Sequence, residues 1–358
     1  MPPAFLSNVL RKTPTIARLA NRGVLSVSGS QAPEFLHGLL STQVSDPPKG
    51  PFYSAFLHAQ GRVMYDVFLY TQQTSTGLPG YLLEYDCRSS EAQPMLPMLK
   101  QYVLRKKVKI RDVSDQYDVW TAWGSELVSE VPKTWNWAKS GCVEPVWGGD
   151  KWPWGTEHES IADRRADTLG KRLLIRKGDK QANSHDIGSA SDYLLHRIAL
   201  GVSEGIDDIV PMHAFPMESN LDVMGALDFR KGCYVGQELT VRTYHTGMVR
   251  KRILPVLLHE PGNPSESIGA IPEFPLHLDI RPMRTALPSQ DKALPRLRGN
   301  GKLFSTYGQF GLALLRLEHV TSALKNELAF EIENPSDGKI WQVSPWFPNW
   351  WPEPPVEE

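Results

Sequence analysis

The stretch FRKGCYVGQELTVRTYHTG, residues 229–247, is the part of this sequence that departs most from a generic globular pattern. Cys233 stands between Gly232 and Gly236. Glycines allow a tight loop with exposed backbone amides, and the residues GQELTVRT that follow can begin a helix. The pattern therefore predicts a cysteine on a tight loop immediately before a helix.

Charged and polar side chains flank this cysteine on both sides. Arg230 and Lys231 precede it, and Gln237 and Glu238 would lie in the first helical turn, where a carboxylate suits the helix dipole. A thiolate is stabilised by neighbouring positive charge and by the amides at a helix N-terminus. A free cysteine is also one of the residues most often buried. The residues alone leave Cys233 open as a working thiol, a metal ligand or a buried side chain.

The chain has three cysteines, Cys87, Cys142 and Cys233, which are far apart in the sequence. This odd number and wide spacing suggest neither a disulfide framework nor a zinc finger, and a reducing compartment fits best. His213 and His245 could join Cys233 in space, although lone histidines are usually satisfied by ordinary hydrogen bonds. Because a permanent iron–sulfur cluster takes several cysteine ligands from its host, Cys233 could offer at most one shared, transient ligand.

Composition describes an ordinary globular protein of 358 residues, with 41% hydrophobic and 22% charged residues. A formal net charge of -1 argues against a broadly basic nucleic-acid binder, and we expect no nucleic-acid partner. No apolar run approaches the length needed to cross a bilayer, so we expect no membrane insertion. Residues 1–23 contain four basic residues and no acidic one, which fits an organelle presequence or a basic arm equally well.

Hydrophobic periodicity predicts an α+β unit over residues 15–115, with an antiparallel sheet and helices on one face. The expected elements are a strand at 23–29, a helix within 30–43, paired strands within 51–72, a strand at 80–87, and a helix followed by a basic strand within 90–114.

A second α+β unit is expected over residues 116–247, and the two units may interleave in sequence. Its elements are a strand at 116–126, a strand region within 166–178 and a helix within 189–205. Residues 131–158 are rich in tryptophan and read as an irregular loop held to the domain by aromatic anchors. The alternatives for this loop are a flat-ligand or nucleobase site, or a scaffold surface that recruits partners.

The last part of the chain, residues 248–350, is predicted to be a small all-β barrel with a proline-rich surface insertion at 260–297. The segments 249–260 and 309–320 are its strand candidates. The tail at 344–358 is aromatic and then acidic, and we expect its tryptophans to dock onto the body of the protein.

The motif KGCYVGQE at 231–238 resembles the K-G-C-[FY]-x-G-Q-E signature of the YgfZ-type proteins, which are relatives of the folate-dependent aminomethyltransferase (T-protein) of the glycine cleavage system. Residues 215–252 resemble the mitochondrial branch of this family almost throughout, and residues 23–46, 58–70 and 311–320 resemble other family segments. The signature residues of the loop are Lys231, Gly232, Cys233, Tyr234, Gly236, Gln237 and Glu238.

This resemblance implies a ring of two α+β units and a C-terminal β-barrel, with Cys233 facing the central opening as a functional thiol. It also implies a non-enzymatic assembly factor of the mitochondrial matrix, acting late in the maturation of 4Fe–4S proteins. The implied partners are the A-type iron–sulfur carrier proteins, and the clients are aconitase-type enzymes and the radical enzymes such as lipoate synthase. No firmly bound cofactor is implied, only a transient iron–sulfur cluster of which Cys233 would be a shared ligand.

The alternative function is tetrahydrofolate-dependent aminomethyl transfer. The acidic residue that the aminomethyltransferases use in catalysis matches Asp66 in GRVMYD, and a carboxylate can act as a general base. In their pterin-binding segment this chain reads HRIALG, which keeps Arg197 but has Ala199 in place of a glutamate. Glu204 could substitute if the loop bends back, and Glu218 in PMESNL is another acidic residue that the resemblance places near the cleft. An alanine cannot make the paired hydrogen bonds that a pterin edge requires, so we expect an inherited folate cleft that has lost its ligand.

Overall fold

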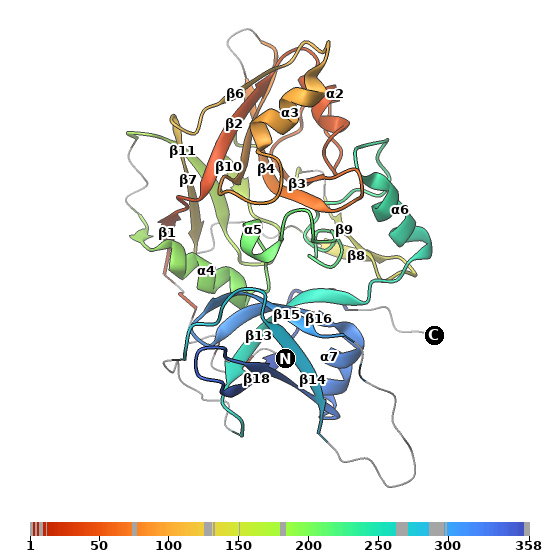
Figure 1. Cartoon of the computed structure of the whole chain (residues 1–358). Helices are drawn as coiled ribbons and strands as arrows, with labels where there is room; N and C mark the ends of the chain where they lie inside the picture. The colour runs from red at the N-terminus through yellow and green to blue at the C-terminus, as the bar shows by residue number, and fades with distance from the viewer. Residues whose placement is uncertain are drawn as a thin grey trace. The chain divides into compact units, whose positions relative to one another are not determined.

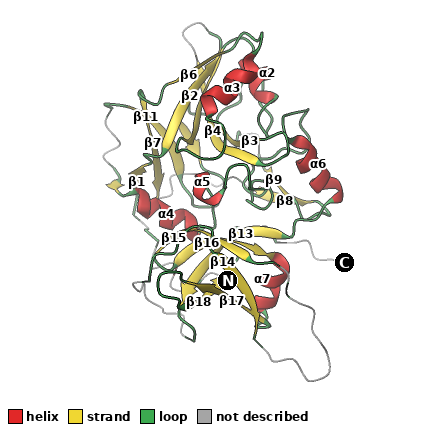
Figure 2. Cartoon of the chain, viewed as in Figure 1, coloured by secondary structure: helices red, strands yellow, loops and turns green. Residues whose placement is uncertain are grey.

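The computed structural model describes residues 3, 6, 10–11, 13–73, 77–124, 131, 133–149, 151–179, 184–262, 271–285, 297 and 299–353. The chain forms two compact units. The large unit contains Arg11–Tyr193 and Glu204–Met248, and the barrel unit contains Leu194–Ser203 and Val249–Trp351. Figure 2 shows that strands dominate both units.

The first sheet of the large unit is antiparallel and has the strand order β3-β4-β5-β2-β6. Its strands are β2 (Arg22–Ser28), β3 (Phe52–Leu57), β4 (Val63–Gln73), β5 (Pro79–Asp86) and β6 (Lys109–Asp112). The helices α2 (Ala32–His37) and α3 (Met95–Val103) accompany it (Figure 1). β3 is buried along its whole length, which explains its nearly continuous apolar sequence. The predicted order of strands and helices is confirmed.

The second sheet of the large unit has the order β10-β11-β7-β1-β12. Its strands are β1 (Thr15–Arg18), β7 (Tyr117–Trp123), β10 (Ser160–Ala162), β11 (Lys171–Arg176) and β12 (Asp186–Ile187). β1 pairs antiparallel with β7 and parallel with β12. The first described strand, β1, therefore belongs to the second sheet, and the strands of the first sheet follow it in the sequence.

The expectation of an irregular loop at 131–158 is wrong in part, because the segment contains a β-hairpin. β8 (Lys133–Trp137) pairs antiparallel with β9 (Val143–Trp147). A two-stranded ribbon leaves one edge of each strand unbonded, so it accommodates Pro145 within β9. The expected aromatic anchoring is confirmed: the Trp154 ring lies 6.3 Å from those of Tyr53 and Trp147.

The barrel unit contains a closed barrel with the order β13-β16-β15-β14-β17-β18. Its strands are β13 (Lys251–His259), β14 (Asp279–Arg284), β15 (Gly301–Tyr307), β16 (Phe310–Arg316), β17 (Leu328–Glu333) and β18 (Ile340–Pro345). Apolar side chains from all six strands fill its core, among them Leu254, Val256, Ile280, Leu303, Leu315, Phe330, Ile332 and Val343.

Two expectations for this barrel need correction. The presumed surface insertion at 260–297 contains β14, a barrel strand, which its prolines and arginines concealed. The presumed strand at 309–320 ends at Arg316, and the chain continues as helix α7 (Leu317–Leu324). The insertion residues 263–270 and 286–296 lie outside the described residues.

Docking of the aromatic tail is confirmed for the residues that the structure describes. Trp346 is 1% exposed and Trp350 is 7% exposed. The indole N–H of Trp350 donates a hydrogen bond to the carbonyl oxygen of Leu200 at 2.9 Å.

Three further helices complete the described elements: α4 (Ala190–Ala199), α5 (Gly205–Asp208) and α6 (Gln237–Thr246). One of the points at which the chain passes between the two units falls within α4, after Tyr193. The predicted helices within 189–205 and after Gly236 are thereby confirmed.

We expect Gly170→Ala to destabilise the large unit much more than Gly178→Ala. Both glycines have positive φ, +104° and +98°, so an alanine at either position is strained. A Cβ at Gly170 would also lie 2.0 Å from the carbonyl oxygen of Ala122 on β7, whereas a Cβ at Gly178 meets nothing within 4 Å. The expected loss in unfolding free energy is roughly 1 kcal/mol for Gly178→Ala and roughly 3 kcal/mol or more for Gly170→Ala. Urea titration measures both, and equal losses would contradict this account.

Candidate functional site

The signature loop meets α6 at Gly236, whose backbone has the left-handed conformation. Gly236 has φ +82° and is the residue that caps the N-terminus of α6. A Cβ there would lie 2.4 Å from the carbonyl oxygen of His58, so backbone sterics as well as conformation require glycine. The backbone N–H of Tyr234 donates to Oε1 of Gln237 at 3.2 Å. The loop thus closes onto the first residue of the helix.

Lys231 anchors the loop to the turn that follows α2. Its Nζ donates hydrogen bonds to the carbonyl oxygens of His37 and Leu40, both at 2.6 Å, and of Thr42 at 3.1 Å. An ammonium has three N–H donors, and three acceptors receive them. Nζ also lies 4.7 Å from the centre of the Tyr234 ring. Burial lowers the pKa of Lys231 to about 8.

Backbone contacts reinforce this anchor. The N–H of Val235 donates to the carbonyl oxygen of Gly38 at 3.1 Å, and the N–H of Asp228 donates to that of Ser41 at 3.0 Å. Oδ1 of Asp228 accepts the N–H of Arg230 at 2.9 Å. Segment 228–236 is therefore fixed at several points to residues 37–42.

Cys233 is exposed on this anchored loop, and Gly232 and Glu238 beside it are exposed too. Cys87 is also exposed, whereas Cys142 is buried. In the part of the chain that the structure describes, no group of three or more His, Cys, Asp or Glu side chains is placed to hold a metal ion. The arrangement can present one thiol to another molecule.

The cations next to Cys233 in the sequence both have partners. Arg230 forms an ion pair with Glu144 of β9 at 3.3 Å, although 70% of its side chain is exposed. The ammonium of Lys231 donates its hydrogen bonds to carbonyl oxygens. The ring of Tyr244 on α6 stacks on that of Phe229 with centres 4.2 Å apart. Burial and a hydrogen bond to Glu144 raise the pKa of Tyr244 to about 12. The β8–β9 hairpin thus supports the loop and α6 through Glu144.

Asp66 is a buried carboxylate on β4. Its Oδ1 accepts the N–H of Gly205 at 3.2 Å, and its Oδ2 lies 3.7 Å from Nη1 of Arg22. Burial raises the pKa of Asp66, while the charge of Arg22 opposes this shift. Arg22 has its shorter ion pair, 2.9 Å, with Glu84 on β5.

Glu204 is also buried within ion pairs. Its Oε2 accepts hydrogen bonds from Arg165 at 2.6 Å, from Arg172 of β11 and from the Tyr193 hydroxyl at 3.1 Å. Arg172 also lies 3.6 Å from Glu84. These contacts link the two sheets of the large unit. The members of this buried ion-pair cluster are Arg22, Asp66, Glu84, Asp163, Arg165, Arg172 and Glu204.

Arg197 and Glu218 are the other residues expected in a folate cleft. Nη1 of Arg197 donates to the carbonyl oxygen of Val202 at 3.0 Å. Glu218 is half-buried in a segment of turns. The structure thus brings Asp66 and Glu204 into one cluster and places Cys233 on a separate, exposed loop.

Sequence reasoning missed the buried arginines and Glu84. Their signal was a charged residue inside an otherwise apolar strand, as in GYLLEYD and KRLLIR. Such residues are rarely buried unless they are paired. The sequence alone does not indicate which residues the buried arginines and Glu84 pair with.

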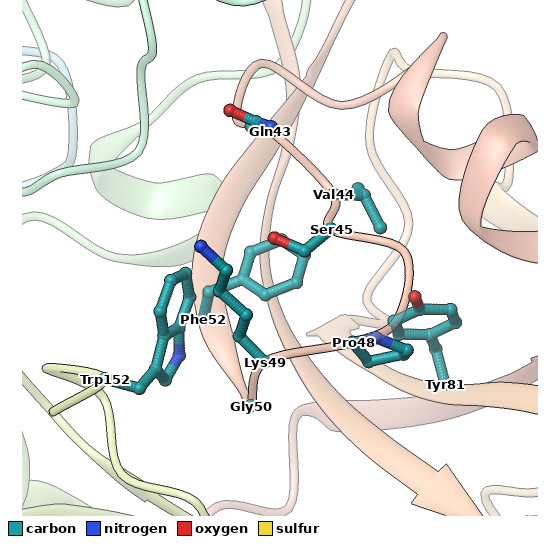
Figure 3. Close-up of a pocket in the computed structure, with 9 residues that line it drawn as sticks. All are labelled: Gln43, Val44, Ser45, Pro48, Lys49, Gly50, Phe52, Tyr81 and Trp152. Carbon is teal, nitrogen blue, oxygen red and sulfur yellow. The ribbon is translucent and has the colours of Figure 1, made fainter. Parts of the chain in front are cut away.

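A small pocket lies elsewhere in the large unit (Figure 3). Its lining residues are Gln43, Val44, Ser45, Pro48, Lys49, Gly50, Phe52, Tyr81 and Trp152. The buried hydroxyl of Tyr81 makes no hydrogen bond with the described residues. None of the candidate site residues lines this pocket.

Comparison with known proteins shows similarity along most of the chain. The family model described as the CAF17 C-terminal beta-barrel domain matches residues 250–353. The protein named mitochondrial iron-sulfur cluster assembly factor IBA57 homolog from Cryptococcus neoformans is 40% identical over 324 residues, covering 85% of this chain and 84% of that protein. Its namesakes from Pyricularia oryzae and Mycosarcoma maydis are 37% and 35% identical and cover 89% and 94% of this chain, and 76% and 85% of their own lengths.

The fold resembles that of a solved aminomethyltransferase. The glycine cleavage system aminomethyltransferase T from Bartonella henselae superposes with a TM-score of 0.59 over 95% of this chain and 87% of that one. The sequence identity is 11%, so this likeness concerns the fold alone. The predicted α+β fold with a C-terminal barrel is confirmed.

Replacing Lys231 by Met should lower the free energy of unfolding by about 3 kcal/mol at pH 7, because three carbonyl oxygens lose their donor. Urea titration measures this loss. Lys151, an exposed lysine, provides the control, since Lys151→Met should leave stability nearly unchanged.

The difference between wild type and Lys231→Met should also depend on pH. Below about pH 8 the ammonium is protonated in the folded and the unfolded chain, so it adds no pH dependence. Between about pH 8 and the ordinary value of 10.5, the unfolded chain binds more protons, so the relative stability of the wild type should rise with pH. A flat profile over this interval, followed by a fall above about pH 10.5, would mean that the carbonyl oxygens hold the pKa of Lys231 above its ordinary value.

Proposed function

Because this chain belongs to the family of mitochondrial iron–sulfur cluster assembly factors that includes the IBA57 homologs, we propose that it is an iron–sulfur cluster assembly factor of the mitochondrial matrix. It acts late in the maturation of 4Fe–4S proteins, as a non-enzymatic factor. Its exposed Cys233 contacts the iron, the cluster or the carrier that delivers it. The observation that carries this proposal is the exposed thiol on an anchored signature loop.

The number of ligands explains why the proposed site needs a partner. Iron–sulfur clusters are normally held by several cysteine thiolates. The described part of this chain has no metal-ligand group of three or more side chains. Cys233 would therefore be one ligand of a cluster whose other ligands belong to a second protein, and the cluster is cargo.

Anchoring of the loop favours such a shared contact. Lys231, Val235 and Asp228 hold the backbone on both sides of Cys233. A loop that is already ordered loses less conformational entropy when a partner binds. The thiol can thus be presented in one position without a metal of its own.

The proposed partners are the A-type iron–sulfur carrier proteins, and the proposed clients are 4Fe–4S enzymes such as aconitase and lipoate synthase. The family relationship supports a partner within the iron–sulfur assembly machinery. The choice of the A-type carrier follows from the resemblance of the signature loop.

Cys233→Ser should weaken the complex with a cluster-loaded A-type carrier by about tenfold or more, because serine removes the thiolate ligand. Anaerobic size-exclusion chromatography and visible circular dichroism measure the complex and the cluster. Cys87→Ser is the matched control, because Cys87 is also an exposed free thiol; it should behave like the wild type. If Cys233→Ser kept the wild-type affinity and cluster spectrum, the thiol would have no part in the transfer.

Tetrahydrofolate-dependent aminomethyl transfer is the second candidate, and the fold likeness and buried Asp66 favour it. The residues present do not fit a pterin. Ala199 lacks the hydrogen-bonding groups, and the Glu204 carboxylate is used by two buried arginines. We therefore propose that the chain uses no folate cofactor.

Titration calorimetry with tetrahydrofolate should accordingly show no saturable heat for the wild-type protein. The same titration on an authentic aminomethyltransferase provides the positive control. Saturable binding that is lost in Asp66→Asn, with the fold retained by circular dichroism, would restore the transferase reading.

A further inference from the structure

An unusual concentration of positive charge lies between α3 and the end of β6. Residues 100–111 contain six basic residues and no acidic one, although the whole chain has a net charge of -1. Lys106 forms an ion pair with Glu34 at 2.6 Å. The other five are exposed and have no ion pair with any residue that the structure describes: Lys100, Arg105, Lys107, Lys109 and Arg111.

An aliphatic side chain projects from the middle of these cations. Leu104 is 86% exposed, and Tyr102 nearby is 40% exposed. Leu104 also has φ +46° and ψ -112°, a conformation that a leucine rarely adopts. Folding alone gives no reason to retain leucine here, because glycine would suit this backbone better and no core contact would be lost. Such an outlier points to a function for the side chain.

The geometry of β6 directs the cations outward. β6 is an edge strand of its sheet and pairs with β2 alone. Ile110 is buried, while Lys109 and Arg111 on either side of it are exposed, as strand alternation requires. Helix α3 packs beside β6 and leads into Leu104 (Figure 1). We call the five unpaired cations together with Leu104 the basic edge.

We propose that the basic edge binds the surface of a membrane that contains anionic phospholipids. Lysine and arginine near such a surface each contribute about 1 kcal/mol of attraction. An exposed apolar side chain can enter the boundary between headgroups and acyl chains. Leu104 would make that contact, with the cations around it on phosphate groups.

Several features favour lipid over an acidic protein or a nucleic acid. Three of the five cations are lysines, which act as flexible point charges and suit headgroups that have no fixed arrangement. The pocket described above has none of these residues in its lining. The most exposed apolar group is aliphatic, whereas single-stranded nucleic acid is bound by stacking on aromatic side chains.

The proposed contact of the basic edge with a membrane is peripheral. Among the described residues, no helix is long and apolar enough to cross a membrane. The proposal does not depend on Cys233 or on cluster transfer, because the basic edge shares no residue with the signature loop.

Co-sedimentation of the full chain with lipid vesicles tests the proposal. At low salt the wild type should pellet with vesicles of phosphatidylcholine and phosphatidylserine, and stay in solution with phosphatidylcholine alone. The triple variant Arg105→Gln, Lys107→Gln, Lys109→Gln should bind the anionic vesicles about 100-fold more weakly. Its control changes net charge equally, at Lys151→Gln, Lys325→Gln and Lys339→Gln, which are exposed lysines elsewhere; it should bind nearly as well as the wild type.

Leu104→Gly separates membrane contact from folding. The glycine suits the positive φ, so thermal stability should be kept or raised, while vesicle binding should fall. No pelleting of the wild type with anionic vesicles, or equal losses in the two triple variants, would overturn the proposal. Retention on immobilised polyglutamate without vesicle binding would assign the basic edge to an acidic protein and equally overturn it.

Discussion

Three fully buried guanidinium groups set the strongest constraint on the large unit. Arg22, Arg165 and Arg172 have side chains with no solvent exposure. Removing such charges from water costs several kcal/mol each unless carboxylates and hydrogen bonds replace the lost hydration. The carboxylates come from β4, β5 and the segments around Asp163 and Glu204. The two sheets must therefore meet in the one arrangement that brings these groups together.

This constraint supports the proposal that the chain uses no folate cofactor, although its fold resembles that of an aminomethyltransferase. A catalytic carboxylate must be free to exchange a proton or meet a substrate. Asp66 instead accepts a backbone N–H and lies beside Arg22, and Glu204 serves two arginines at once. Burial raises the pKa of Asp66, and the neighbouring carboxylate of Glu204 adds to this shift while Arg22 opposes it. The interior carboxylates thus serve to hold the sheets together.

Local patterns predicted the elements whose causes are local. Alternating apolar residues predicted β2, a short apolar run predicted β5, and the glycine before Gln237 marked the start of α6. The β8–β9 hairpin and β14 escaped because proline and charged residues interrupt their patterns, and only pairing across strands explains them. The end of β16 at Arg316 is likewise decided by the packing of α7 against β17.

Contacts between distant segments could not be predicted from one sequence. Lys231 binds carbonyl oxygens nearly two hundred positions earlier, and Arg172 reaches Glu84 on another sheet. The motif identified Lys231 as significant, and its position suggested a charge that stabilises the thiolate. The structure shows that the three N–H donors of Lys231 also form hydrogen bonds with backbone carbonyl oxygens.

The position of Cys233 follows from these two arrangements together. The buried charges of the large unit form ion pairs with one another and tolerate little change. A group that must contact another molecule therefore has to lie on the surface. A surface loop gains such a role only if it is ordered before the partner arrives. Lys231, Gly236 and the backbone contacts to residues 37–42 supply that order while leaving the thiol exposed. A single ordered thiol with no further ligand group among the described residues supports the proposal that Cys233 shares a metal or a cluster with a partner, because a cluster normally takes several cysteine ligands.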